Sequence, residues 1–277
     1  MNGLDYFTAG WLGVLQGFTE FLPISSSGHL AIVQRRLELD PDSPPLLMFD
    51  VAVHLGTLLA IIVVYRHAAL RFVQDLLFES NATGTTPHLP RRVLMLGVLA
   101  TIPTAVIGLT FKARFEAAFD RPAVIGICFV FTGVLLALLT VFPRGRRGWK
   151  KLKWWEAVLV GLAQALAIFP GISRSGATIC MASYCGWRRQ WAAQFSFLIA
   201  VPAIAGGTIL KIRDVAGLTY DPSLQIPWGP IVLGSVVALL VGIVALQLLL
   251  RTIQRGRLQY FAAYCFVAGA VVLTGCT

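Results

Sequence analysis

The sequence predicts an all-α polytopic membrane protein: an inverted-topology repeat of six full transmembrane helices and two re-entrant helical hairpins. Composition is the first reason, because 57% of the 277 residues are hydrophobic and 13% are charged, against about 25% charged in soluble domains. Several apolar runs also reach the roughly 20 residues that cross a bilayer as a helix. Two further apolar segments share the same interruption. None shows the roughly 10-residue alternating pattern of a membrane β-barrel.

Six uninterrupted apolar runs predict the full crossings. They cover residues 47–65, 91–111, 122–142, 191–210, 229–250 and 258–275. Each is close to the length of helix that spans a hydrocarbon core of about 30 Å.

Two other segments predict re-entrant hairpins. Residues 7–34 are broken by PISSSG, and residues 155–186 are broken by PGISRSG. A break at membrane depth leaves backbone N–H and C=O groups unpaired, which is tolerated only where protein or a wet cavity satisfies them. We therefore expect each segment to form two short helices that enter the membrane and return to the same side.

The basic residues favour one orientation of these crossings. If residues 144–153 (RGRRGWKKLK) are cytoplasmic, 15 Lys and Arg fall on the cytoplasmic side and 7 on the opposite side, as the positive-inside rule expects. Both termini then lie outside, the first hairpin enters from outside, and the second enters from the cytoplasm. The net charge of +10 is thus assigned to topology and anionic lipid, with no nucleic-acid partner.

The two broken segments are copies of one another at an offset of 148 residues. Residues 13–30 (GVLQGFTEFLPISSSGHL) align without gaps on 161–178 (GLAQALAIFPGISRSGAT), with 7 identities in 18 positions. Three crossings follow each hairpin, so the second copy is inverted relative to the first. The sequence therefore predicts one integral membrane domain with a first repeat at 1–150 and a second at 151–277, whose breaks meet near the midplane.

The differences between the copies predict one composite site. Glu20, Ser26 and His29 of the first copy stand where the second has Ile168, Arg174 and Ala177. A site built from both breaks would hold one carboxylate, one imidazole, one guanidinium and several hydroxyls. Ionisable groups inside membranes are costly, which favours a functional interpretation.

An anion fits the restart of each hairpin. The first N–H groups of a helix have no partners and its dipole is positive there, and Ser25 or Ser26, and Ser173, are good N-cap residues. Two facing helix N-termini favour phosphate, and the guanidinium of Arg174 suits its oxygens.

Glu20 and His29 add proton chemistry to this anion site. Glu20 would be repelled by bare phosphate, which indicates a general base, a ligand of a bridging divalent cation, or both. His29 could donate a proton to a leaving phosphate or stabilise it. The structural alternatives are an ion pair between Glu20 and Arg174 without a catalytic role, and a His29 that is a hydrogen-bonded core residue. Asp50 and His54, four residues apart on one helix face, suit structural hydrogen bonding or a supporting role.

Through these motifs the chain resembles the undecaprenyl-diphosphate phosphatase family, also called bacitracin-resistance proteins. Gln16 and Glu20 in QGFTE match the family's (E/Q)xxxE motif, and PISSSGH (23–29) matches its serine-rich stretch. PGISRSGAT (170–178) matches PGxSRSGxT, and the resemblance includes FDVAVHLGTLLA (49–60). It covers essentially the whole chain.

The resemblance implies hydrolysis of undecaprenyl diphosphate to undecaprenyl phosphate and phosphate, which recycles the cell-wall lipid carrier and confers bacitracin resistance. It implies a multi-pass protein of the bacterial plasma (inner) membrane, surrounded by membrane lipids, with the site facing the periplasm. It also implies Mg²⁺ or Ca²⁺, with Glu20 as metal ligand. Monomer and homodimer both stay open.

The same resemblance supplies the site residues. The catalytic set is Glu20, Ser26, His29 and Arg174, with Ser26 and water as alternative nucleophiles. The substrate-binding set is Gln16, Ser25, Ser27, Gly28, Ser173, Ser175, Gly176 and Thr178.

Two other functions compete with the hydrolysis of undecaprenyl diphosphate. Inverted repeats with broken helices are a transport architecture, so a polyprenyl-phosphate flippase is the alternative. A phosphatidic-acid-type phosphatase is excluded, although SSSGH resembles that family's SGH element. Arg114, not Lys, lies seven residues before Arg121, and SRSGATICMASY contains no His or Asp.

Overall fold

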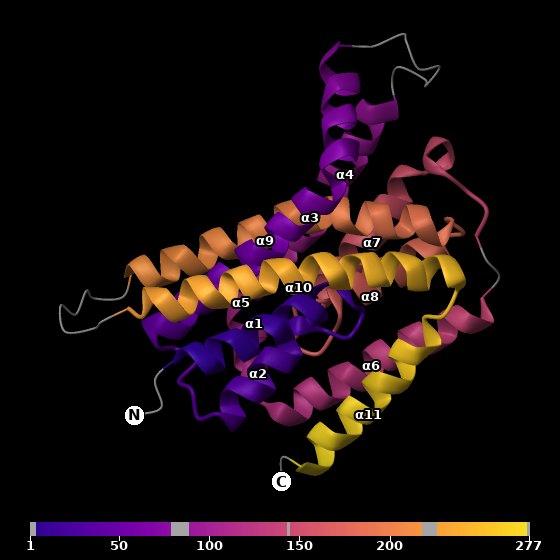
Figure 1. Cartoon of the computed structure of the whole chain (residues 1–277). Coiled ribbons are helices and arrows are strands. Elements are labelled where there is room, and N and C mark those ends of the chain that lie inside the picture. The colour runs from indigo at the N-terminus through magenta and orange to yellow at the C-terminus, as the bar shows by residue number, and fades with distance from the viewer. Residues whose placement is uncertain (1–3, 79–88, 143–144, 218–225, 276–277) are drawn as a thin grey trace.

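The computed structural model describes residues 4–78, 89–142, 145–217 and 226–275, and within these ranges the protein is all-helical. The α-helices are α1 (Tyr6–Phe21), α2 (Ser26–Arg36), α3 (Pro44–Phe78), α4 (Leu89–Thr110), α5 (Lys112–Phe119), α6 (Pro122–Val141), α7 (Trp154–Leu166), α8 (Arg174–Tyr184), α9 (Arg189–Gly217), α10 (Trp228–Arg255) and α11 (Gln259–Gly275) (Figure 1). A short 3₁₀ helix, η2, covers Trp149–Lys151. Among the described residues, β-structure is limited to one isolated bridge.

Five helices are long and apolar enough to cross a membrane, namely α3, α4, α6, α9 and α10. This confirms the predicted class of all-α membrane protein. Each of the six predicted crossings is helical, although α11 has only 17 residues, about 26 Å of helix at 1.5 Å per residue.

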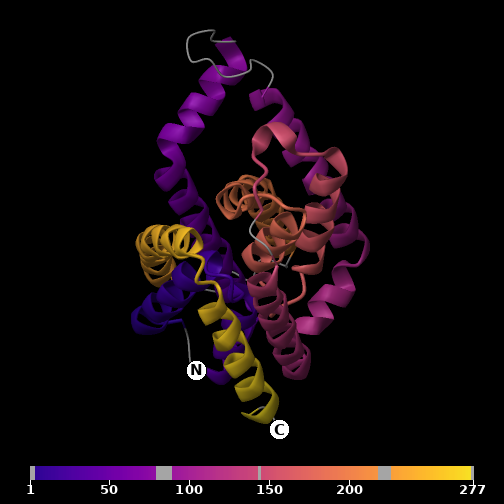
Figure 2. The same ribbon diagram turned by 90° about the vertical axis from the view of Figure 1, so that its right-hand side faces the viewer.

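Hydropathy misplaced the end of α3. The apolar run stops at residue 65, yet the helix continues to Phe78 and has 35 residues. Residues 66–78 contain no Gly or Pro, the residues that most often end a helix, so the polar stretch stays helical. Figures 1 and 2 show the end of α3 and the start of α4 extending beyond the other helices. The short helix α5 was also not predicted, because its KARFEAAF sequence is too charged and too short to read as a crossing.

The two predicted hairpins are helix–break–helix units whose second helices match in length and in their serine caps. Helices α2 and α8 have 11 residues each, and their first residues, Ser26 and Arg174, are 148 positions apart. Their N-caps are Ser25 and Ser173, whose hydroxyls accept hydrogen bonds from the third residue of each helix. The expected restart at each break is therefore confirmed, with Ser25 and not Ser26 as the first cap.

Each hairpin packs its first helix closely on the other half of the chain. Helix α1 lies along α10, and α7 lies along α4, while α6 packs on α11. Gly13 and Gly161, matched positions of the repeat, make these contacts possible. A Cβ at Gly13 would lie 2.5 Å from the Gly234 carbonyl oxygen, and one at Gly161 would lie 2.1 Å from that of Ala100. Small residues thus let the backbones approach, as membrane helices commonly do.

The two breaks touch one another, as the repeat predicted. A Cβ on Gly28 would lie 2.8 Å from Cα of Gly171, and the N–H of Gly171 donates to Ser25 Oγ at 3.1 Å. Thr132 of α6 donates to the Gly171 carbonyl at 3.0 Å and accepts from the N–H of Ser173 at 3.1 Å. Neighbouring protein thus satisfies backbone groups that the broken helices leave unpaired.

A buried ion pair holds the loop before α7 to the segment after α8. The side chain of Glu156 is fully buried and contacts Arg147 at 2.5 Å. It also accepts from Nε1 of Trp187 at 2.9 Å and from the backbone N–H of Lys153 at 3.0 Å. A carboxylate without water needs such partners.

We therefore expect Glu156→Ala to destabilise the protein by about 3 kcal/mol, because it leaves the Arg147 guanidinium without its counter-ion and the Trp187 N–H without an acceptor. The value is at the low end because the Arg147 side chain keeps 30% exposure to solvent. Thermal unfolding of the purified protein in detergent measures the loss. The exposed neighbour Lys151→Ala is the control, and equal melting temperatures for both variants would contradict the prediction.

Candidate active site at the meeting of two helix breaks

A cavity of about 600 Å³ opens beside the two breaks, between α3, α4, α9 and the α7–α8 segment. Its polar part is lined by residues of both breaks and of α3: Glu20, Ser25, Ser26, Ser27, His54, Ser173 and Arg174. Its remaining walls include the apolar side chains of Ala105, Leu109, Phe115, Phe119 and Ile168. One polar end and a longer apolar wall suit an amphiphilic ligand.

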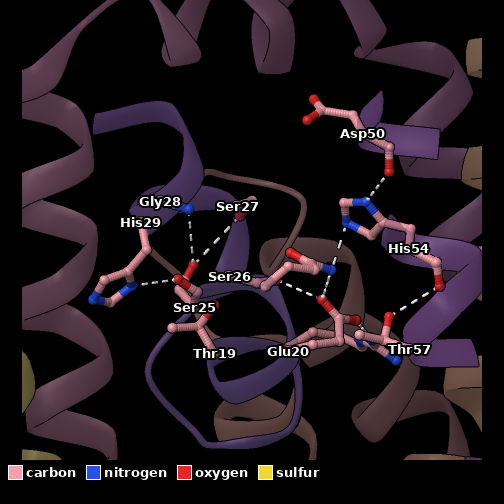
Figure 3. Close-up of polar contacts among 12 residues, drawn as sticks. Thr19, Glu20, Ser25, Ser26, Ser27, Gly28, His29, Asp50, His54 and Thr57 are labelled. Atoms are coloured by element: carbon pink, nitrogen blue, oxygen red, sulfur yellow. Dashed lines mark hydrogen bonds and ion pairs between the residues drawn. The ribbon is translucent and has the colours of Figure 1, made fainter. Parts of the chain in front are cut away.

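Glu20 is the centre of the polar end (Figure 3). It lies in the last turn of α1 and is 7% exposed. Its carboxylate forms an ion pair with Arg174 and accepts hydrogen bonds from Ser26 Oγ at 2.5 Å and from Gln16 Nε2 at 3.1 Å. Because Ser26 and Arg174 are the first residues of α2 and α8, the two restarted helices deliver their side chains to one carboxylate. The structure thus brings together three of the four predicted catalytic residues.

Ser25 holds the first break in a strained conformation. Its φ of 70° lies in the left-handed region, which costs a non-glycine residue about 1–3 kcal/mol and is found mainly at functional sites. The Ser25 hydroxyl accepts from the N–H groups of Gly28 at 3.4 Å and Gly171 at 3.1 Å. The strain is therefore offset by hydrogen bonds that join both breaks.

The predicted substrate-binding residues divide into two groups. Ser25, Ser27 and Ser173 line the cavity beside the catalytic residues. The other predicted residues are absent from the lining and support the breaks on the side away from the cavity. They are Gln16, Gly28, Ser175, Gly176 and Thr178. Thr178 Oγ1, for example, pairs with Ser196 Oγ at 2.5 Å and with the Arg174 carbonyl at 2.8 Å.

The two histidines lie on opposite sides of Ser26 (Figure 3). His29, predicted as catalytic, points away from Glu20, with Nδ1 2.7 Å from the Ser25 carbonyl and Nε2 2.7 Å from the Tyr264 hydroxyl. His54 lines the cavity, with Nε2 4.0 Å from a Glu20 oxygen. Its Nδ1 lies 2.7 Å from the Asp50 carbonyl, which can only accept, so Nδ1 carries hydrogen and Nε2 faces the cavity.

Sequence reasoning gave His54 no site role beyond a possible supporting one, and it missed several other cavity residues. Gln164 occupies the position of Gln16 in the second repeat, so the alignment itself carried the signal. Lys112 and Lys211 were counted only as topological charges. In the structure Lys211 pairs with Asp50 at 3.0 Å.

Lys112 pairs with Asp214 at 2.8 Å, so both lysines tie the walls of the cavity to residues of a neighbouring helix. The hydrogen bond to Asp214 raises the pKa of Lys112. Lys112, Lys211 and Asp50 all line the cavity.

A divalent cation can be tested against the oxygen atoms near Glu20. Within the described residues, no three side chains of His, Cys, Asp or Glu gather as a metal-binding group. Beside the Glu20 carboxylate, Gln16 Oε1 is buried and has no hydrogen-bond partner. One carboxylate and one amide oxygen fit a cation such as Mg²⁺ that takes most of its ligands from phosphate and water.

Comparison with known proteins shows the family to which the chain belongs. Residues 9–271 match the family described as bacitracin resistance protein BacA. A protein of Syntrophotalea carbinolica named undecaprenyl-diphosphatase is 41% identical over 273 residues, covering 97% of this chain and 98% of its own. Proteins of the same name from Carboxydothermus hydrogenoformans and Methanobrevibacter smithii are 37% and 34% identical over 270 and 280 residues. Those alignments cover 98% of this chain and 97% and 98% of the relatives. The chain therefore belongs to the bacitracin resistance protein BacA family.

Proposed function

We propose that this protein hydrolyses undecaprenyl diphosphate to undecaprenyl phosphate and inorganic phosphate, and thereby recycles the cell-wall lipid carrier and confers bacitracin resistance. The observation that carries the proposal is the cluster of Glu20, Ser26 and Arg174 at two helix N-termini in a cavity with an apolar wall. The helix N-termini and guanidinium suit a diphosphate, the carboxylate and hydroxyl suit its hydrolysis, and the wall suits an isoprenoid. The name shared by the relatives supports the same reaction.

We further propose an inverted repeat of residues 1–150 and 151–277, with α11 as the sixth crossing and both helix–break–helix units as re-entrant hairpins. The equal lengths and matched serine caps of α2 and α8 support this arrangement. So does the packing of each hairpin on the second crossing of the other half, α1 on α10 and α7 on α4. The distribution of Lys and Arg favours a site open to the periplasmic face of the bacterial inner membrane.

In the mechanism that we propose, substrate binding changes the partner of Arg174. A diphosphate offers oxygens that match the guanidinium fork, so it competes with Glu20 for Arg174. Glu20 is then released from its positive partner while its hydrogen bond with Ser26 persists. The carboxylate becomes available as a base when the substrate arrives.

Two displacements then complete the reaction. Ser26 Oγ attacks the terminal phosphorus, and its proton passes to Glu20 and on to the oxygen of the departing undecaprenyl phosphate. Water next attacks the phosphoserine and gives a proton to Glu20, which returns it to Ser26 Oγ as phosphate leaves. Arg174 and the N–H groups of α2 and α8 stabilise the charge on the phosphoryl oxygens in both steps. A bound Mg²⁺ or Ca²⁺ would be held by Glu20, with Gln16 Oε1 beside it, and would add positive charge beside the diphosphate.

The placement of the histidines gives a further prediction. His54→Ala should lower kcat/KM for phosphate release by about tenfold, because it removes a polar group of the cavity wall whose Nε2 lies 4.0 Å from the Glu20 carboxylate. His29→Ala should have a smaller effect, because His29 acts on the site only through the Ser25 carbonyl. Steady-state kinetics of the two variants, with melting temperatures as the folding control, compare them. The reverse order of effects would place His29 at the reacting phosphate.

Phosphate release by the purified protein tests the proposed function. The protein in detergent should release phosphate from undecaprenyl diphosphate, and less after EDTA treatment if a divalent cation takes part. The same preparation in liposomes, assayed for movement of a labelled polyprenyl phosphate across the bilayer, tests the flippase alternative. Lipid movement without phosphate release would reject the hydrolase.

A further inference from the structure

Gln164 is a buried amide on the cavity wall that the proposed mechanism does not use. It lies on α7, is 2% exposed, and lines the cavity together with Thr104 of α4. Its Nε2 donates to Thr104 Oγ1 at 3.1 Å, and Thr104 Oγ1 donates to the Gly161 carbonyl at 3.1 Å. Its Oε1 is buried and has no hydrogen-bond partner.

These hydrogen bonds fix which way the amide faces. The single hydroxyl proton of Thr104 is used on the Gly161 carbonyl, so its oxygen can only accept from Gln164. Turning the amide over would set two acceptor oxygens against each other. The carbonyl oxygen of Gln164 therefore faces away from Thr104, without a protein donor.

The matched residue of the first repeat shows what is different at Gln164. Gln16 Nε2 donates one hydrogen bond to Glu20, and although its own Oε1 is likewise buried without a partner, the residue is absent from the cavity lining. In the second repeat the position of Glu20 is taken by Ile168, so no carboxylate accompanies Gln164. A buried acceptor without a donor is uncommon in folded proteins and calls for an explanation. Gln164 differs from Gln16 in lining the cavity, so the explanation that we take is a ligand that reaches Oε1 when it settles against this wall.

We propose that Gln164 is a further substrate-contacting residue, whose Oε1 accepts a hydrogen bond from an O–H group in the cavity. The O–H belongs to a protonated terminal phosphate or to a water molecule bound beside it. Arg174 and the helix N-termini bind bare phosphoryl oxygens, whereas an amide oxygen can recognise only a donor. Gln164 thus orients the phosphoryl end from the α4–α7 wall. The assignment rests on the proposed phosphatase function.

Gln164→Met tests this contact because it removes the amide and keeps a side chain of similar length. We expect kcat/KM for phosphate release to fall about tenfold, the usual effect of one hydrogen bond. Inhibition by inorganic phosphate and by sulfate identifies the donor, because phosphate carries an O–H near neutral pH and sulfate carries none. If the O–H is on phosphate, the wild type prefers phosphate to sulfate and the variant loses that preference. If it is on water, kcat falls and the preference stays unchanged.

Two variants separate ligand contact from packing. Thr104→Val keeps the amide but releases its orientation, so it should show a smaller loss of kcat/KM in the same direction. Gln194→Met removes an amide of α9 that is absent from the cavity lining and should leave both activity and anion preference unchanged. Gln164→Met with wild-type kinetics and anion preference would overturn the contact. A wild-type protein that releases no phosphate would instead reject the proposed function.

Discussion

Glu20→Gln is expected to lower kcat for phosphate release by about 10²- to 10⁴-fold, the range for loss of a general base. The amide has nearly the same shape, can still accept from Ser26 Oγ, and cannot take its proton. It also removes the negative partner of Arg174, so diphosphate should bind at least as tightly as before. The variant should therefore lose kcat without a rise in KM.

Kinetics with undecaprenyl diphosphate, together with melting temperatures, measure this effect. Glu116→Gln is the matched control, because Glu116 also lines the cavity but lies 3.5 Å from Lys112 at a different part of the wall. It should retain kcat within about twofold, since exposed ion pairs contribute little. A folded Glu20→Gln protein with normal kcat would remove Glu20 from the chemistry and leave it as the structural partner of Arg174.

Ser26→Ala is expected to lower kcat by about 10³-fold or more, as loss of an attacking group does in other hydrolases. Ser26 is the hydroxyl nearest to the base, at 2.5 Å from Glu20, and it is not the cap of α2, because Ser25 has that role. Its removal should therefore leave the helix start and the melting temperature nearly unchanged.

Rapid quenching of the wild type with substrate labelled in the terminal phosphate gives a direct second measurement. Label should appear on the wild-type chain and be absent from Ser26→Ala. Ser183→Ala is the control. It removes a buried hydroxyl of α8 that lies outside the cavity lining, and it should behave as wild type in both assays. If Ser26→Ala keeps most of its kcat and no label is trapped, water is the nucleophile.

Most of the secondary structure could be predicted because each signal was local. Apolar runs located a helix at each of the six predicted crossings, five of them long and apolar enough to span a membrane, and Pro, Gly and Ser located both breaks. The end of α3 and the presence of α5 were missed, because hydropathy reports the apolar part of a helix and not its hydrogen-bonded ends. Residues 66–78 and 112–119 are sequences in which charged residues interrupt the apolar ones, and they remain helical because neither contains Gly or Pro.

The part of the site that comes from the two matched breaks was predictable from the repeat. The fixed offset placed Glu20, Ser26 and Arg174 together before any coordinates, since two copies of one motif in inverted repeats can meet at a pseudo-two-fold axis. The direction of each side chain was not predictable. His29 follows Ser26 by three residues on α2, yet its ring lies against Phe129 and Tyr264, while His54 arrives from α3 to face Glu20.

By itself the sequence determined the helical membrane class, the two matched breaks and the three groups that meet between them, because composition, periodicity and repetition are properties of the chain alone. Only the tertiary structure decided which imidazole faces the carboxylate and which serine is a cap. It also decided which of the two matched glutamines lines the cavity. Those outcomes depend on how separate segments pack, as in the contacts of Gly171 with Ser25, Arg174 with Glu20 and His54 with Glu20. No local pattern encodes the direction in which such side chains turn.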